Sequence, residues 1–474
     1  MVTLTCHQAH QSGSPENCSG VETLRLLSGL CGNLLPHHRA AGQPDCLNLL
    51  QNLWKGNRAL KRSVYTTIVL CLLLGGCTPA GPAPEQTTSP PPSPSEPQST
   101  QALAAETPEP EAPLGSGEIV YQEGVEPLTA EQEAAIHAYM TAAYEALARL
   151  EEPDFAALFT NQTQAAASEA GISLQIALRT MTEGVDYSLT GYRYTLNCRE
   201  TAVNGDGTVS FQALETSVQN FAQFPGVDSE RGRNFHSFVL AETSEGWLVQ
   251  SHMQYDTLYG RLMDGGDWQG DFAQAYIDAM PAFLEEIRSA QAARAEAGDG
   301  DAALPVAEHP YDRAAALAYA DQYAMTRNDS WADFSYSGGN CQNYVSQCLL
   351  AGGIPADPYG DAVWTYGGEG YERSGSWASV SQFVSYAAAN TGYGLAAQVG
   401  APYGSGQPGD IIQMGDGDGE GWHHTVLIRD VVTNGSGAVV DYLVNSNTND
   451  MRNYPASLYG YPVFALTRIA GWND

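Results

Sequence analysis

A cysteine, a histidine and an asparagine occur in the order that thiol-based acyl transfer can use. Cys341 follows a Gly-Gly-Asn stretch and opens a run whose apolar residues recur at helical spacing. His424 opens an apolar strand-like stretch, and Asn445 and Asn447 lie at the end of the next one. A thiol needs a base to accept its proton, and the base needs a third group to hold its ring. The order predicts a cysteine hydrolase site.

The predicted position of Cys341, in the first turn of a helix, favours this chemistry. Unpaired backbone N–H groups point outward there, so the thiol should ionise more easily and an oxyanion should find donors. The alternative is a buried structural cysteine, which is the common state of a free Cys. The stretch by itself leaves both interpretations open.

The elements that carry these residues belong to the carboxy-terminal third. We predict helices from Tyr311 to about Arg327, from Cys341 onward, and over 380–390. The aromatic, Gly-rich stretch before the last helix either lines a cleft or packs as a long loop. Four strands are predicted at 410–414, 424–431, 439–444 and 464–469.

The preceding segment reads as a separate α+β domain. Thr129 and Gln132 form a capping-box pattern ahead of an amphipathic helix that reaches Leu150. Short helices are predicted at 155–159 and 174–181, strands at 187–196, 209–218, 235–240 and 247–251, and a helix at 271–297. This order is similar to cystatin-like and NTF2-like folds. No nucleophile and base stand out, so we expect a binding or spacing role and independent function of the later segment.

The amino-terminal region reads as an export address. Residues 55–77 contain a basic stretch, an apolar run from Val64 to Leu74 and Gly75-Gly76-Cys77. The end of this run resembles the lipobox of bacterial lipoproteins, in which Cys77 would carry the lipid. An ordinary signal peptide cut nearby is the alternative. Residues 78–117 are rich in Pro, Ser, Thr and Glu, as in a solvated spacer, and residues 1–54 fit an overextended reading frame.

Composition excludes several classes of function. The chain has 21 Lys and Arg against 54 Asp and Glu, and no lysine follows Lys61. Nucleic-acid binding requires a basic surface, so we expect no nucleic-acid partner, and a catalytic lysine is excluded after that position. Four cysteines remain from Cys77 onward, which is no disulfide framework. The acidic run 416–420 lacks the terminal Glu of a calcium loop, so we expect neither metal nor cofactor.

The segment from Tyr311 to the end resembles the bacterial family of putative amidase domains, a papain-like group related to cell-wall peptidases of the NlpC and CHAP type. Asn340, Gln342 and Asn447 stand where that family usually has Asp, Thr and His. The matching stretches are Tyr311-Asp312-Arg313-Ala314-Ala315-Ala316, Gly338-Gly339-Asn340-Cys341-Gln342-Asn343-Tyr344-Val345-Ser346-Gln347, Ser376-Trp377, Gly409-Asp410-Ile411-Ile412, His423-His424-Thr425-Val426 and Asn447-Thr448-Asn449-Asp450.

The resemblance implies a papain-like α+β fold and assigns the site. It favours His424 over His423 as the base, and Asn447 over Asn445 as the third member. Strand alternation places Val426 and Ile428 on the face of His424. Possible cleft residues are Asn340, Gln342, Asn343, Trp364, Trp377 and Trp422.

The organisation and function predicted from these observations are as follows. We expect a monomeric, lipid-anchored, extracytoplasmic cysteine amidase or peptidase that acts through a thioester, with peptide or peptidoglycan amides as substrates. The alternative is a non-catalytic cell-wall or ligand-binding lipoprotein that retains the fold. The predicted parts are 1–54 (spurious or disordered extension), 55–77 (lipoprotein signal), 78–117 (linker), 118–297 (α+β domain), 298–310 (linker) and 311–474 (catalytic domain).

Replacement of the lipidation candidate tests the anchor. We expect Cys77→Ala to release the protein from membranes, because acylation is the anchor that the sequence predicts after signal removal. The measurement is fractionation of cells at high salt, followed by detection in the membrane and soluble fractions. A mutant that stays with the membranes would contradict the lipoprotein interpretation.

Overall fold

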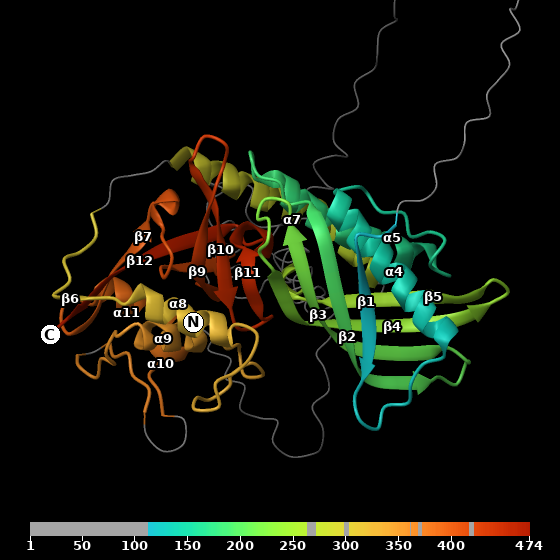
Figure 1. Ribbon diagram of the computed structural model, residues 1–474, viewed down its shortest axis with the longest axis horizontal. Coiled ribbons are helices and arrows are strands. Elements are labelled where there is room, and N and C mark those ends of the chain that lie inside the picture. Colours follow the sequence, from blue (N-terminus) through green and yellow to red (C-terminus); the bar gives the residue numbers. More distant parts are fainter. Residues whose placement is uncertain (1–111, 263–271, 298–302, 361, 368–371, 417–420) are drawn as a thin grey trace, which may run out of the picture. The chain divides into compact units, whose positions relative to one another are not determined.

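A mixed, mostly antiparallel sheet of twelve strands dominates the computed structural model, which describes residues 112–262, 272–297, 303–360, 362–367, 372–416 and 421–474 (Figure 1). Its main path runs β1-β2-β3-β4-β11-β10-β9-β8-β12-β6, with β5 beside β4 and β7 beside β12. The strands are β1 (Gly115–Tyr121), β2 (Leu189–Val203), β3 (Val209–Phe221), β4 (Ser229–Thr243), β5 (Gly246–Tyr255), β6 (His309–Pro310), β7 (Gly394–Ala401), β8 (Ile411–Gly415), β9 (His424–Thr433), β10 (Val439–Ser446), β11 (Met451–Pro455) and β12 (Val463–Asn473).

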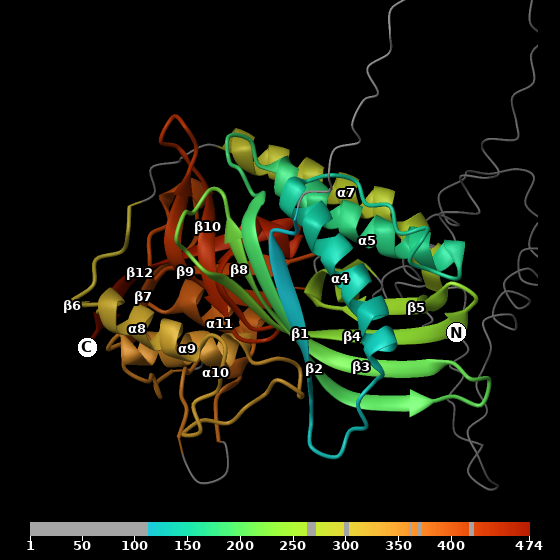
Figure 2. The ribbon, with the colours of Figure 1, turned by 45° about the vertical axis from the view of Figure 1, so that its right-hand side comes forward.

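Helices cover this sheet in two groups. Figure 2 shows α4 and α5 across β1–β5, with α8 and α9 beside the later strands. Among the described residues, no helix is long and apolar enough to cross a membrane, and the apolar run 64–74 lies outside them. The helices are α4 (Ala130–Arg149), α5 (Gln162–Met181), α6 (Thr257–Leu262), α7 (Phe272–Ala297), α8 (Arg313–Tyr323), α9 (Cys341–Ala351), α10 (Gly375–Ala378) and α11 (Val380–Ala389), with short 3-10 turns η1 (Tyr403–Ser405) and η2 (Ala456–Tyr459).

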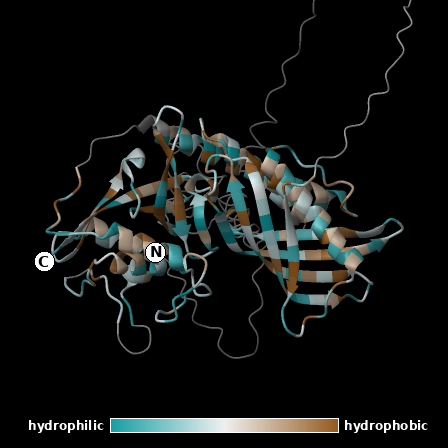
Figure 3. Cartoon of the chain, viewed as in Figure 1, coloured by the Kyte–Doolittle hydropathy of each residue, from teal (hydrophilic) through white to brown (hydrophobic). Residues whose placement is uncertain are grey.

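Local sequence signals explain the first helix and strands. Thr129 caps α4: its hydroxyl accepts the Gln132 N–H at 3.3 Å, and the Gln132 side chain accepts the Thr129 N–H at 3.0 Å. The predicted capping box is therefore confirmed. Along β3, buried and less buried residues alternate, which appears in Figure 3 as alternating bands on the strands. This period of two places one face of β3 against the core.

Several predicted elements differ in the structure. Residues 155–159 form a turn and a single β-bridge from Phe159 to Val249 instead of a helix, and the Phe155 and Phe159 rings both pack against Tyr139 of α4. The strand β1 begins at Gly115, inside the predicted linker, and pairs in parallel with β2. The strand β11 escaped prediction because Asn453 and Pro455 are turn-type residues, and Asn453 has φ +53°.

The two faces of the later strands bury different partners. Val426 and Ile428 of β9 join a core cluster with Tyr459 of η2. Leu427, between them, joins a second cluster with Val345 of α9. The helix α9 therefore lies on the face that carries Leu427, as the alternation of a strand requires.

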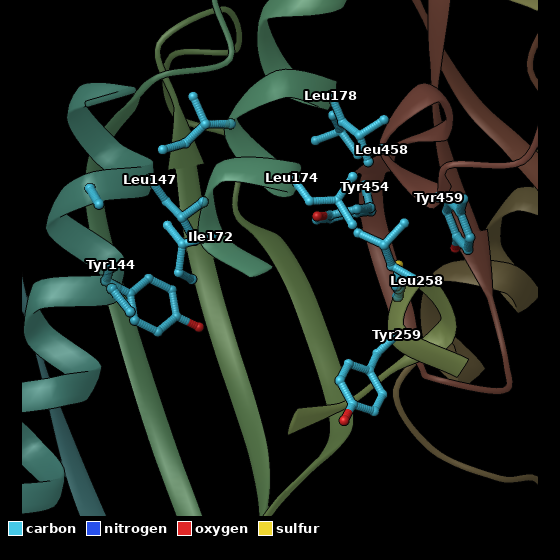
Figure 4. Close-up of a cluster of buried hydrophobic side chains, with 14 of the residues drawn as sticks. Tyr144, Leu147, Ile172, Leu174, Leu178, Leu258, Tyr259, Tyr454, Leu458 and Tyr459 are labelled. Atoms are coloured by element: carbon cyan, nitrogen blue, oxygen red, sulfur yellow. The ribbon is translucent and has the colours of Figure 1, made fainter. Parts of the chain in front are cut away.

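The predicted first and second domains share a strand pairing and a core. Met451 and Arg452 of β11 pair with Arg231 and Glu230 of β4. Figure 4 shows Leu178 of α5 beside Leu458 of η2, with Leu258 of α6 near them, and all three belong to one buried cluster. The later segment therefore shares part of its buried apolar surface with the earlier one, and its independent function stays a prediction.

Gly460 makes the shared core sensitive to a single methyl group. It has φ +68°, and a Cβ there would lie 2.6 Å from Leu258 Cδ1. We expect Gly460→Ala to lower the free energy of unfolding by about 1–3 kcal/mol, through backbone strain and overpacking. Gly205→Ala is the matched control, since nothing lies within 4 Å of its added Cβ. Urea unfolding of both variants decides, and equal stabilities would contradict the close packing described for Gly460.

Candidate active site

The loop before α9 presents Cys341 at the first position of the helix. Gly338 and Gly339 have φ +93° and +105°, a region that L side chains rarely adopt, so this turn requires glycines. Asn340 is the N-cap residue, but its side chain makes no capping bond to α9. Its backbone N–H instead donates to Thr448 Oγ1 at 2.6 Å. The predicted placement of Cys341 at a helix start is thus confirmed.

The thiol of Cys341 lies among backbone N–H groups in a buried position. The N–H groups of Thr425, Gln342 and Cys341 itself are directed to the sulfur, and each favours the thiolate. Burial acts in the opposite direction and is the larger effect, so the pKa of the thiol is raised. The expectation of easier ionisation is therefore wrong for this structure, in which Cys341 is 6% exposed.

His424 begins β9 and is held by aromatic rings. Its ring centroid lies 5.2 Å from that of Tyr459 and 6.3 Å from that of Tyr461, nearly parallel to the latter. In the described part of the chain, its buried Nε2 has no hydrogen-bond partner. Burial lowers the pKa of His424 to about 4. The imidazole is therefore neutral at pH 7, although its lowered pKa makes it a weaker base than an exposed histidine.

Cys341 and His424 are both buried and both lie near Tyr459 and Tyr461, and we call these four residues the candidate cluster. The amide directed to the thiol belongs to Thr425, the residue directly after His424. Burial raises the pKa of both tyrosines, and the charge of an ionised Cys341 adds to this rise. The same two rings contact His424. The nucleophile and base expected from the sequence thus share their immediate neighbours.

The prediction places Asn447 beside His424, where it would orient the imidazole. Its side chain instead binds other groups. Its Nδ2 donates to the carbonyls of Tyr323, Ala324 and Thr326, and its Oδ1 accepts from Asn340 Nδ2 at 2.7 Å. Both ends of the amide are engaged, so Asn447 holds the residue before the nucleophile and the end of α8. These contacts do not support its expected role beside His424, which stays a prediction.

Asn445, the other candidate for the third member, is also engaged elsewhere. Its Nδ2 donates to Asp321 Oδ1 at 2.9 Å, and its Oδ1 accepts the Asn453 N–H at 2.9 Å. These contacts tie β10 to α8 and β11. Neither asparagine donates to or accepts from His424 in the hydrogen bonds of the described residues.

Most of the predicted cleft residues are buried. Trp364 and Trp377 are fully buried and stack with centroids 4.9 Å apart. Their indole N–H groups donate to Ser346 Oγ at 3.1 Å and Asn343 Oδ1 at 2.8 Å. The alternative of loop packing therefore holds for both tryptophans, because side chains satisfied inside a core cannot line an open cleft.

The remaining predicted cleft residues divide by exposure. Asn340 is 2% exposed, while Gln342 and Asn343 are fully buried. Gln342 Nε2 donates to Ser346 Oγ at 3.2 Å, inside α9. Among these predicted cleft residues only Trp422 is half-buried, and its backbone N–H donates to Ser381 Oγ at 2.9 Å. The burial of Asn340, Gln342 and Asn343 does not support their assignment to an open cleft, and the assignment of Trp422 stays a prediction.

Sequence reasoning missed the tyrosines that surround the base. Tyr459 and Tyr461 flank Gly460 in a short stretch after β11, a strand that was itself not predicted. A Tyr-Gly-Tyr sequence has no periodicity that identifies a site. Gly460 adopts the left-handed conformation between the two tyrosines, and the rings of Tyr459 and Tyr461 both lie near His424.

One group of side chains has the spacing of metal ligands. Glu308, His309 and Asp474 place three possible ligand atoms within 4.8 Å of one another. His309 Nε2 already lies 3.1 Å from Asp474 Oδ1, and the imidazole stacks on Trp472. Two of the three residues are exposed, so an ion pair accounts for the grouping.

Comparisons with known proteins concern the segment that carries this cluster. Residues 310–463 match the family model of the putative amidase domain. The uncharacterized protein YhbB of Bacillus subtilis (strain 168) is 32% identical over 148 residues, which are 30% of this chain and 43% of that protein. The match thus spans less than half of the relative's length. At this coarse level, the segment is similar to hydrolases that act on amides.

A structural comparison adds no argument. The crystal structure of a putative aromatic ring hydroxylase from Novosphingobium aromaticivorans DSM covers 27% of this chain and 90% of its own, at 17% identity. Its TM-score is 0.18.

Thiol labelling tests the environment of Cys341. We expect a maleimide to modify Cys341 before Cys198 and Cys348, which are fully buried, and the rate to rise further above about pH 9, because burial raises the thiol pKa. The measurement is peptide mass spectrometry over time at several pH values. Cys341→Ala is the control and should remove the fast phase. A rate that levels off below pH 8 would contradict a raised pKa.

Proposed function

We propose that this protein is an exported cysteine amidase or peptidase that hydrolyses an amide bond through a thioester. The observation that supports it most is that Cys341, at the start of α9, and His424, at the start of β9, lie near the same two tyrosines inside the segment that matches the amidase family model. Cys341 is the nucleophile and His424 the general base and acid.

The reaction follows from groups around the thiol. His424 accepts the Cys341 proton as the sulfur attacks the substrate carbonyl, and the backbone N–H groups at the start of α9 face the developing oxyanion. The resulting imidazolium returns its proton to the leaving amine, so a thioester remains. Water, deprotonated by His424, then attacks the thioester and releases the acid and the free thiol.

Burial makes the resting pair neutral. The raised pKa of Cys341 and the lowered pKa of His424 both favour the uncharged forms. The proton must therefore move during attack, and the base is needed at the step itself. If the thiol and the imidazole were already ionised at rest, the Cys341 proton would not have to move during attack.

We propose that aromatic packing orients the imidazole of His424, the proposed base. We place Tyr459 and Tyr461 in this role because both rings contact His424, whereas Asn447 is bound to Asn340. Asn447 then acts as a positioning residue for the loop that presents Cys341. The role expected of a single third residue is thereby divided. The two tyrosines orient His424, and Asn447 positions the loop before Cys341.

The finer parts of the proposal concern fold, substrate and place. A papain-like arrangement for the later segment and a cystatin-like or NTF2-like one for the earlier segment agree with a helix-borne cysteine and an antiparallel sheet. A lipid anchor at Cys77, outside the described residues, would hold the protein at the extracytoplasmic face of a bacterial membrane. Peptide amides of peptidoglycan are the substrates that this location offers.

A non-catalytic binding protein is the second candidate. The burial of both Cys341 and His424, with 6% and 4% exposure, favours it, because a substrate carbonyl must reach the sulfur. Incubation with purified peptidoglycan and with small peptide amides distinguishes the two. Release of new carboxylates, identified by mass spectrometry, supports the hydrolase, and binding without product supports the alternative.

Substitution of the two proposed catalytic residues tests the mechanism. We expect Cys341→Ala and His424→Ala each to lower kcat/KM by at least on the order of 10³-fold, and the double variant to lose little more, because the two act as one unit. Cys198→Ala and His137→Ala, which lie in the earlier segment, are the controls and should keep turnover. The measurement is steady-state hydrolysis of one peptide amide. Full activity of Cys341→Ala would exclude a cysteine hydrolase.

A further inference from the structure

We propose that Arg261, which precedes the amidase-matched segment, is a positioning residue for His424 and completes the site from the earlier part of the chain. It acts through Tyr461 and Asp416 and does not touch the reacting atoms. The inference rests on the proposed function of His424 as the base. It assigns the earlier segment a part in catalysis beyond binding or spacing.

Arg261 and His424 both pack against Tyr461. The guanidinium carbon lies 4.2 Å from the centroid of the Tyr461 ring, and that ring lies almost parallel to His424 at 6.3 Å. A guanidinium over an aromatic face is attracted by the ring's electrons. Because the Arg261 side chain is only 11% exposed, solvent weakens this attraction little. The Arg261 side chain, which belongs to α6, therefore holds the Tyr461 ring in place.

Arg261 also binds the strand end that pairs with His424. Its Nε and Nη2 donate to Asp416 Oδ1 at 2.8 Å and 2.5 Å. Asp416 directly follows β8, whose Met414 pairs with His424. His423 Nε2 lies 3.4 Å from the other oxygen of Asp416. The start of β9 is thus fixed on two sides by one guanidinium and its carboxylate.

A third contact joins Arg261 to the turn between the two tyrosines. Its Nη1 donates to the carbonyl of Gly460, the glycine against which Leu258 of α6 packs. The guanidinium therefore binds Asp416, the Gly460 carbonyl and the Tyr461 face together. A planar fork of several donors can make these contacts at once, whereas a lysine ammonium at the same place could make only part of them.

The helix that carries Arg261 is itself anchored in the earlier segment. Asp256 Oδ1 accepts the Tyr259 N–H at 2.9 Å at the start of α6, and Asp256 Oδ2 pairs with Arg231 Nη2 at 2.9 Å. Asp256 and Arg231 are both buried, and Arg231 belongs to β4, which pairs with β11. The position of Arg261 is consequently set by the same strand that joins the two segments.

The pKa of His424 gives a readout that a purely structural role would not move. The titratable groups whose rings lie near His424 are Tyr459 of η2 and Tyr461 after it; Arg261 packs on Tyr461 and binds Asp416, and Cys341 of α9 lies near the same two tyrosines. Burial is the cause of its lowered pKa. If Tyr461 loses its support, water reaches the imidazole and the pKa rises toward the ordinary value of about 6.5.

The test compares Arg261→Ala, Arg261→Lys and Arg288→Ala in the full chain. Arg288 is the control, since it forms an exposed pair with Glu285 on α7. We expect Arg261→Ala to lower kcat about 10- to 100-fold with KM changed less than about threefold, as for a misplaced catalytic group. Arg261→Lys should recover part of the loss. NMR titration of the imidazole should show a higher His424 pKa in Arg261→Ala than in the wild type.

The two measurements separate this inference from the proposed function. If the wild type hydrolyses no amide, or if Cys341→Ala keeps full activity, the proposed function fails. The NMR titration of His424 still tests the role of Arg261. If Arg261→Ala keeps both kcat and the His424 pKa, the inference is overturned. If that variant does not fold, Arg261→Lys decides, and wild-type kcat with an unchanged His424 pKa in it overturns the inference.

Discussion

The pairing of β4 with β11 is the contact on which the geometry of the candidate site depends. It spans two residue pairs, but side chains extend it: Ser229 Oγ donates to the Asn453 carbonyl at 2.7 Å, and Tyr187 OH donates to the buried Asp441 at 2.7 Å. Directly after β11 the chain makes the turn that carries Tyr459 and Tyr461. The rings around His424 are therefore positioned by strands that lie far upstream in the sequence.

Burial, more than charge pairing, sets the acid–base properties of the cluster. Three backbone N–H groups favour the thiolate, yet the loss of water around Cys341 outweighs them. His424 experiences the same loss, with no carboxylate among the causes of its shift. A neutral pair in a buried site avoids the larger desolvation cost of a charged pair, although the unpartnered Nε2 of His424 still carries a cost of its own. Desolvation therefore favours the protonated form of the Cys341 thiol.

Local patterns predicted the elements, and contacts distant in sequence decided the site. The alternation of β3, the capping box at Thr129 and the helix start at Cys341 each depend on a few neighbouring residues, and the structure agrees with them. The role of Asn447 and the burial of Trp364 depend on partners about 20 to 120 residues away. Hydrophobic periodicity contains no information about such partners. Arg261 shows the limit most clearly, because it lies outside the segment that carries the recognisable motifs.

The contact between Asn340 and Asn447 gives physical meaning to two departures from the family pattern. The resemblance leads one to expect Asp and His at these positions, and the structure places the two side chains 2.7 Å apart, Asn340 Nδ2 donating to Asn447 Oδ1. The departures are therefore one change: a neutral amide pair stands where an acid and an imidazole would otherwise meet. An amide has both a donor and an acceptor whatever the pH, so the loop before Cys341 keeps its bond in acid and base. In this chain, the side-chain contact that fixes the loop before Cys341 is made by two amides, neither of which titrates.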